Sequence, residues 1–113
     1  MDWIKRKYTM STDKYGDWLA YVTKFKNCYG NNIIIYQRTG GVYQGPDGGY
    51  FTDGGHTMSN LCYLVPNWQE YDIIDKICKH YDCEMIGDNK ELQSVHGSQL
   101  IQAILAIYTF IVD

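Results

Sequence analysis

The 113-residue sequence predicts one α+β domain, in which an antiparallel sheet from residues 3–56 packs against two or three helices from residues 60–112. Two observations support this fold class. The first half alternates apolar and polar residues with the period of two that is typical of strands, and glycine-rich turns separate its segments. The second half repeats apolar residues at helical spacing. No proline-rich, serine-rich or charged stretch divides the chain, so we expect residues 1–113 to form a single domain.

Three strands are expected in the first third of the chain. Alternation in Trp3–Met10 predicts the first strand, and Trp18–Cys28 predicts the second. The turn Tyr29–Asn32 holds glycine and asparagine, which tolerate positive φ, and it predicts a hairpin into the strand Ile33–Tyr36. Three adjacent isoleucines indicate that the third strand is covered on both faces or is central in the sheet.

Glycine dominates the segment from Thr39 to His56. Two short aromatic segments flank the turn Gly45–Gly49, which predicts a further hairpin. The stretch Asp53–Ser59 is expected to be a mobile exit loop.

Helices are expected in the second half. Residues after Pro66 and Asn67 repeat apolar side chains at helical spacing as far as Tyr81, with acids early and bases late, as the helix dipole favours. Asp88 and Glu91 match a capping box, which predicts a short helix or turn over residues 89–96. Ser98 is expected to cap a last helix over residues 99–112.

This last helix is apolar almost all round. It is about 20 Å long, which is too short to span a bilayer core of about 30 Å, and we expect no membrane partner. It is either a central core helix or a helix that also buries one face against a second copy of the chain or another protein. Under the second interpretation the interface residues are Ile101, Leu105, Tyr108 and Val112.

Composition is that of a folded protein of the cytoplasm. Hydrophobic residues make up 45% and charged residues 20%, which excludes a disordered chain. No secretory leader is recognisable, so the four cysteines are expected to be reduced and mostly buried. The abundance of Ile, Tyr, Lys, Asn and Asp is typical of an AT-rich genome, such as that of a low-GC bacterium or its phage.

Charge is unevenly distributed along the chain. The net charge is -3, with six basic against three acidic residues in 1–26 and three basic against eight acidic residues in 67–113. The asymmetry can orient a partner electrostatically. A nucleic-acid-binding domain would need a larger basic excess, so the composition disfavours a nucleic-acid partner.

Neither a metal site nor a cofactor site is predicted. Cys62, Cys78, His80 and Cys83 add up to a Cys3His set, but Cys78 and His80 point to different sides of the expected helix. The repeated Asp-Gly-Gly of Asp47 and Asp53 lacks the alternating oxygen ligands of a calcium loop and indicates turns instead. The sequence has no phosphate-binding glycine motif.

Asp53 and His56 are the one candidate pair for catalysis. They lie close together in the expected loop, near Ser59 and Cys62, which would suit a small hydrolase. Such neighbours also arise by chance in a chain rich in aspartate. We therefore keep the hydrolase as an alternative.

The aromatic residues near the glycine turns predict a surface that binds a partner molecule. Tyrosine and tryptophan beside glycine turns provide rigid contact area on an adaptable backbone. We expect a small non-catalytic protein that inhibits or modulates a larger macromolecule, such as a phage anti-defence factor that acts on a CRISPR effector. The alternative is an oligomer that sequesters a small nucleotide between aromatic rings. The expected binding residues are Tyr36, Tyr43, Asp47, Tyr50, Phe51, Asp53 and His56.

Overall fold

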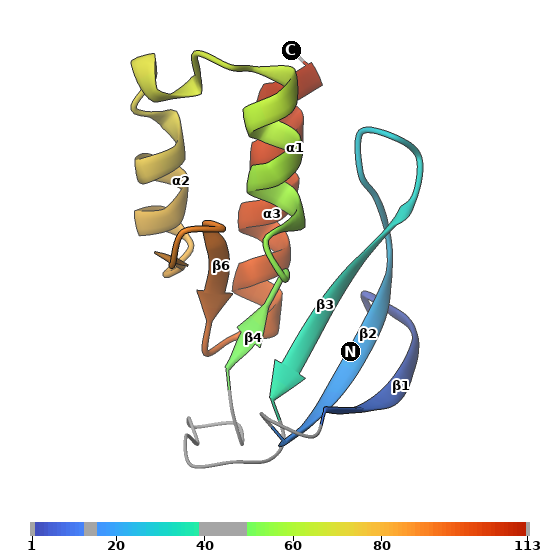
Figure 1. Cartoon of the computed structure of the whole chain (residues 1–113). Helices are drawn as coiled ribbons and strands as arrows, with labels where there is room; N and C mark the ends of the chain where they lie inside the picture. Colours follow the sequence, from blue (N-terminus) through green and yellow to red (C-terminus); the bar gives the residue numbers. More distant parts are fainter. Residues whose placement is uncertain (1, 13–15, 39–49, 113) are drawn as a thin grey trace.

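The computed structural model describes residues 2–12, 16–38 and 50–112 (Figure 1), and of residues 10–12, 16, 17 and 38 it describes the backbone only. The predicted residues Tyr43 and Asp47 and the predicted turn Gly45–Gly49 lie outside the described residues. The elements are β1 (Ile4–Thr12), β2 (Gly16–Lys26), β3 (Asn32–Arg38), β4 (Phe51–Thr52), α1 (His56–Leu64), a 3-10 helix (Trp68–Glu70), α2 (Ile73–His80), β5 (Glu84–Ile86), β6 (Glu91–Ser94) and α3 (Gly97–Val112).

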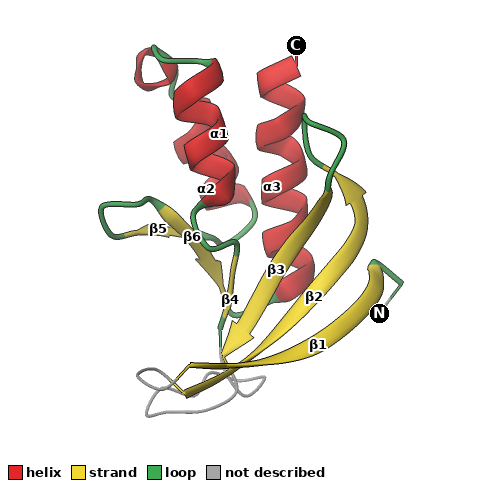
Figure 2. Cartoon of the chain, turned by 45° about the vertical axis from the view of Figure 1, so that its right-hand side comes forward, coloured by secondary structure: helices red, strands yellow, loops and turns green. Residues whose placement is uncertain are grey.

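The six strands form one antiparallel sheet in the order β1-β2-β3-β4-β6-β5. All three α-helices lie on the same side of this sheet (Figures 1 and 2). The predicted α+β class is therefore confirmed. One detail differs, because β5 and β6 come from the second half of the chain and extend the sheet beyond the N-terminal half.

The core lies between the sheet and α3. Leu100, Ile104 and Ile107 of α3 are fully buried, together with Leu61 of α1 and Ile35 of β3. The apolar residues of α3 thus contact the sheet on one side and α1 and α2 on the other. Among the helices in the described part of the chain, none has the length and apolarity needed to cross a bilayer.

The hairpin between β2 and β3 forms as the sequence predicts. Gly30 adopts a φ of 82°, which strains any residue with a side chain. The side-chain oxygen of Asn27 accepts hydrogen bonds from the backbone N–H groups of Tyr29 and Asn31, at 2.9 and 3.1 Å. These two bonds satisfy the turn's backbone, so the register of β2 against β3 is fixed locally.

Two segments differ from their predicted secondary structure. The expected exit loop Asp53–Ser59 contains the start of α1 at His56, after a turn in which Gly54 and Gly55 both have positive φ. The expected helix or turn over residues 89–96 contains β6, and the Asp88–Glu91 pair caps no helix. Residues 91–94 form a strand because β6 pairs with β4 and β5, so contacts distant in sequence outweigh the local capping signal.

The boundaries of the other two helices also differ from the prediction. The helix expected directly after Pro66 and Asn67 is split into the 3-10 helix and α2, which starts at Ile73. In α2 an exposed ion pair joins Lys76 to Asp72 at 3.2 Å. The last helix starts at Gly97, two residues before the expected start at Gln99.

The cysteines differ in accessibility. Cys78 and Cys83 are buried, Cys28 is half-buried and Cys62 is exposed, and all four are free thiols. Burial, with a smaller effect from the neighbouring Cys78, raises the pKa of Cys83 to about 12. No set of three or more His, Cys, Asp or Glu side chains in the described ranges is arranged to hold a metal ion.

We expect thiol reagents to modify Cys62 and to leave Cys83 intact in the folded protein. At pH 8 a thiol with a pKa of about 12 has roughly a thousandfold less thiolate than an ordinary cysteine. Mass spectrometry after brief alkylation, with and without urea, measures the difference site by site. Equal labelling of Cys62 and Cys83 without urea would contradict the burial of Cys83.

The same thiol makes stability depend on pH. A cysteine ionises near pH 9 when unfolded, whereas the folded Cys83 ionises near 12. The folded protein therefore holds its proton where the unfolded chain has lost it, and stability falls as pH rises above about 9. Urea unfolding at pH 8 and pH 10 tests the direction, with Cys83→Ala expected to reduce the loss.

Candidate functional site

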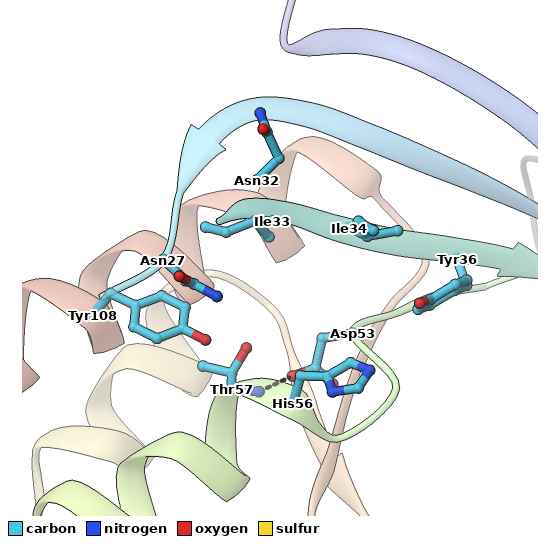
Figure 3. A pocket seen from close by; sticks show the side chains of 9 residues that line it. All are labelled: Asn27, Asn32, Ile33, Ile34, Tyr36, Asp53, His56, Thr57 and Tyr108. Carbon is cyan, nitrogen blue, oxygen red and sulfur yellow. Dashed lines mark hydrogen bonds between the residues drawn. The ribbon is translucent and has the colours of Figure 1, made fainter. Parts of the chain in front are cut away.

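A cleft of about 200 Å³ opens between β3 and the start of α1 (Figure 3). It exists because β4 is only two residues long and pairs with β3 at Tyr36 and Gln37 alone, so on the side away from β2 no strand lies beside the first residues of β3. Its walls come from the β2–β3 turn, β3, the β4–α1 connection and α3. The residues lining this cleft are Asn27, Asn32, Ile33, Ile34, Tyr36, Asp53, His56, Thr57 and Tyr108.

Asp53 has a structural role at the base of the cleft. Its side chain is 2% exposed, and its two carboxylate oxygens accept hydrogen bonds from the backbone N–H groups of Gly55, Thr57 and Leu92 at 2.9, 3.0 and 2.9 Å. Two of these donors lie at the start of α1 and the third in β6. A carboxylate that accepts three backbone hydrogen bonds holds a helix N-terminus against a strand.

Several polar side chains converge on the cleft from different elements. Figure 3 shows the Thr57 and Tyr108 hydroxyls at one end with the Asn27 amide beside them, and His56 with Tyr36 at the other end. The Tyr108 hydroxyl accepts a hydrogen bond from the side-chain amide of Asn60 at 2.9 Å.

Both tyrosine hydroxyls of the cleft stay protonated at neutral pH. Burial raises the pKa of Tyr108, and hydrogen bonds with Asn60 and Thr57 offset part of that rise. Burial also raises the pKa of Tyr36, with smaller effects from Tyr8 and Asp53. The cleft therefore offers hydrogen-bond donors, and it suits a ligand that carries acceptor oxygens.

The side of the sheet away from the helices carries a second candidate surface. Residues opposite one another on paired strands share a face, and the pairing aligns Tyr8, Ala20, Tyr36 and Thr52 in a row across β1 to β4. Trp18 alternates with Ala20 and lies on the same face. Its ring contacts that of Tyr50 edge to face, with 6.1 Å between centroids.

We call Tyr8, Trp18, Tyr36 and Tyr50 the outer aromatic face. Tyr8 is 42% exposed and the other three are half-buried. Ala20 lies between Tyr8 and Tyr36 on the paired strands and is fully buried. Tyr36 belongs both to this face and to the cleft.

The structure separates the residues that the sequence grouped into one binding loop. Tyr36, Asp53 and His56 line the cleft, and Tyr50 lies on the outer aromatic face. Phe51 is 4% exposed and packs against Tyr21, which corrects the expectation that it is presented for contact. The reason is that β4 alternates, so Phe51 faces the helices while Thr52 faces away.

Sequence reasoning missed Tyr8 and Trp18 as binding residues, although both were assigned to strands. It also missed Asn27 and Thr57, whose role depends on where α3 lies. Alternation with the charged residues Lys5 and Lys7 would have put Tyr8 on one face of its strand, but the face itself depends on the register with β2.

Of the four interface residues predicted on the last helix, two are buried and two are at least partly exposed. Ile101 and Tyr108 are buried within the chain, because α3 turns them toward the core and α1. They have no free surface for a second copy, so the expectation is corrected for these two residues. Leu105 is half-buried and Val112 is exposed.

Asp53 and His56 form no hydrogen bond with each other in the described part of the chain. Asp53 instead accepts the three backbone N–H groups described above. Since the orienting acid of a catalytic histidine must accept the imidazole N–H, the small hydrolase gains no support from this geometry. Unchanged activity of His56→Ala in a hydrolase assay would dismiss this alternative.

Comparison with known proteins finds no relative: the chain matches no protein-family model, no curated protein and no solved structure. The proposals below therefore depend on the cleft and on the outer aromatic face.

Proposed function

We propose that this protein is a non-catalytic binding protein that inhibits or modulates a larger macromolecule through its outer aromatic face. One observation carries the proposal: the helices cover only one side of the sheet (Figure 2), and the strand pairing places four partly exposed aromatic rings on the other side. A sheet face that meets only water usually carries polar side chains. Clustered Tyr and Trp side chains are typical of binding hot spots.

The composition supports a phage or mobile-element source, since the residue usage is that of an AT-rich genome. A small rigid domain with a preformed contact face suits a factor that blocks a host defence assembly by occupying its surface. The anti-defence role is thus the most specific form of the proposal.

Affinity capture with matched variants tests the proposal. The tagged protein is crosslinked in cells of its source, and both the protein and the nucleic-acid fractions of the captured material are analysed. We expect a stoichiometric partner with the unchanged chain and its loss with the double variant Tyr8→Ala/Trp18→Ala. The control is Tyr63→Ala, because Tyr63 is 78% exposed on α1, away from this face. Circular dichroism verifies that each variant is folded.

Two outcomes overturn the proposal. One is the absence of any stoichiometric partner with the unchanged chain. The other is a partner that the double variant retains as well as the control variant does.

Sequestration of a small nucleotide or nucleoside is a second candidate function, favoured by the convergent donors of the cleft. A ligand with base carbonyl oxygens is expected to raise the melting temperature by mass action, which a thermal-shift series of nucleosides and nucleotides measures. Tyr108→Phe is expected to remove the effect and Tyr8→Ala to preserve it. A uniform absence of shifts rejects this candidate.

A further inference from the structure

We infer that the outer aromatic face binds single-stranded nucleic acid. The inference deepens the proposed function, on which it rests, by assigning a chemical class to the macromolecule. Sequence composition argues against nucleic acid because the net charge is -3. The fold changes that conclusion, because it separates the charges in space.

The strands β1 and β2 form a basic edge. Side chains described between residues 4 and 37 include five cations and no carboxylate; they are Lys5, Arg6, Lys7, Lys24 and Lys26. Arg6 lies opposite Val22 on the outer side of the sheet, one row from Tyr8. None of Lys5, Arg6 and Lys7 forms an ion pair with a described residue. Asp13 and Asp17 also belong to this stretch, but their side chains lie outside the described part.

Most carboxylates of the described residues lie at the other end of the sheet. Apart from Asp2 and the buried Asp53, the described acidic residues belong to the 3-10 helix, α2, β5, β6 and the turns beside them. Strands β1 and β5 are the two edges of the six-stranded sheet, and five strand spacings amount to roughly 24 Å. The Debye length at physiological salt is only about 8 Å, so the acidic edge does not cancel the field at β1.

Cationic side chains beside exposed aromatic rings suit single-stranded nucleic acid better than a duplex or an acidic protein surface. Phosphates pair with Arg and Lys, while unstacked bases stack on Tyr and Trp. Bases in a duplex are already stacked, so they cannot use the four rings. An acidic protein surface would engage the cations and would leave the stacking capacity of the rings unused.

The test is fluorescence anisotropy with the full chain and labelled 20-nucleotide oligo(dT) and oligo(U), between 50 and 200 mM salt. We expect saturable binding that weakens with salt, and much weaker binding to a duplex of equal length. Arg6→Gln/Lys24→Gln is expected to lower the slope of log affinity against log salt by about 1.4, near 0.7 for each lost contact. Tyr8→Ala/Trp18→Ala is expected to weaken binding about tenfold or more with an unchanged slope.

Matched controls are Lys79→Gln on α2 and Tyr63→Ala on α1, both expected to bind as the unchanged chain does. Arg6 and Lys24 are exposed, so their variants stay informative even if the aromatic variant unfolds. Absence of binding at 50 mM salt overturns the inference, as does equal binding to the duplex or full displacement by polyglutamate at equal charge. If capture yields a protein held by the same face while oligonucleotides do not bind, the proposed function stands and this inference falls.

Discussion

Replacing Asp53 with alanine is expected to lower the free energy of unfolding by about 3–5 kcal/mol, a large part of the stability of a domain of this size. The substitution removes the acceptor of three backbone N–H groups, those of Gly55, Thr57 and Leu92. Hydrogen bonds to a charged group contribute about 1.5–3 kcal/mol each, and a buried donor left without a partner costs roughly 1–3 kcal/mol. Partial entry of water keeps the total below the sum.

Urea unfolding followed by circular dichroism measures this loss. Asp53→Asn retains one side-chain oxygen as acceptor, so its free energy of unfolding is expected to fall less than that of Asp53→Ala. Asp88→Ala serves as the control, since Asp88 is an exposed carboxylate in the turn between β5 and β6. A change below about 1 kcal/mol for Asp53→Ala would show that the three hydrogen bonds do not hold the helix to the strand.

Ile104→Ala is expected to cost about 2–5 kcal/mol, because the side chain is fully buried at the centre of the core. The change removes three carbon atoms and leaves a cavity that well-packed neighbours fill only in part. The prediction follows from the position of α3, which the sheet covers on one side and α1 and α2 on the other.

Gln102→Ala is the matched control on the same helix, since Gln102 is exposed. We expect it to change stability by less than about 0.5 kcal/mol. Unfolding of both variants at several protein concentrations separates core packing from association. A loss for Ile104→Ala that vanished at high protein concentration would indicate that the residue is stabilised by a second copy.

Local signals predicted the strands of the first third of the chain and the last helix. Strands β1 and β2 alternate, β3 contains an apolar run, and the turn Tyr29–Asn32 predicts the hairpin between β2 and β3, so few distant contacts are needed to specify them. The last helix was predicted from its apolar run, and its start was displaced by two residues. In these segments the observed secondary structure is the one that the local sequence favours.

The start of α1 was not predicted, because one of the three hydrogen bonds of the aspartate that holds it comes from a residue distant in the sequence. The sequence Asp53-Gly54-Gly55 is typical of a turn, and the carboxylate also binds Leu92, which is 39 residues away. Strand β6 was missed for the same reason, since it forms only between β4 and β5. A short segment with a weak secondary-structure propensity adopts the conformation that its tertiary contacts favour.

In the candidate site, too, the local sequence predicts some features, whereas others depend on contacts between distant residues. His56 and Tyr36 were singled out from the sequence, but their meeting in one cleft depends on the short β4 and on α3. Tyr8 and Trp18 share a face with Tyr36 only through the register of three strands. The net charge of the whole chain does not reveal that basic and acidic residues lie at opposite edges of the sheet.

The three hydrogen bonds of Asp53 have a consequence for the order of folding. A nine-residue segment such as His56–Leu64 is too short to be a stable helix alone in water, and the Asp53 carboxylate before it gains its third hydrogen bond only when β6 has arrived. We therefore expect an isolated peptide of residues 50–65 to be unstructured and α1 to form late. The β2–β3 hairpin, whose turn is closed by Asn27 within four residues, is then the natural nucleus.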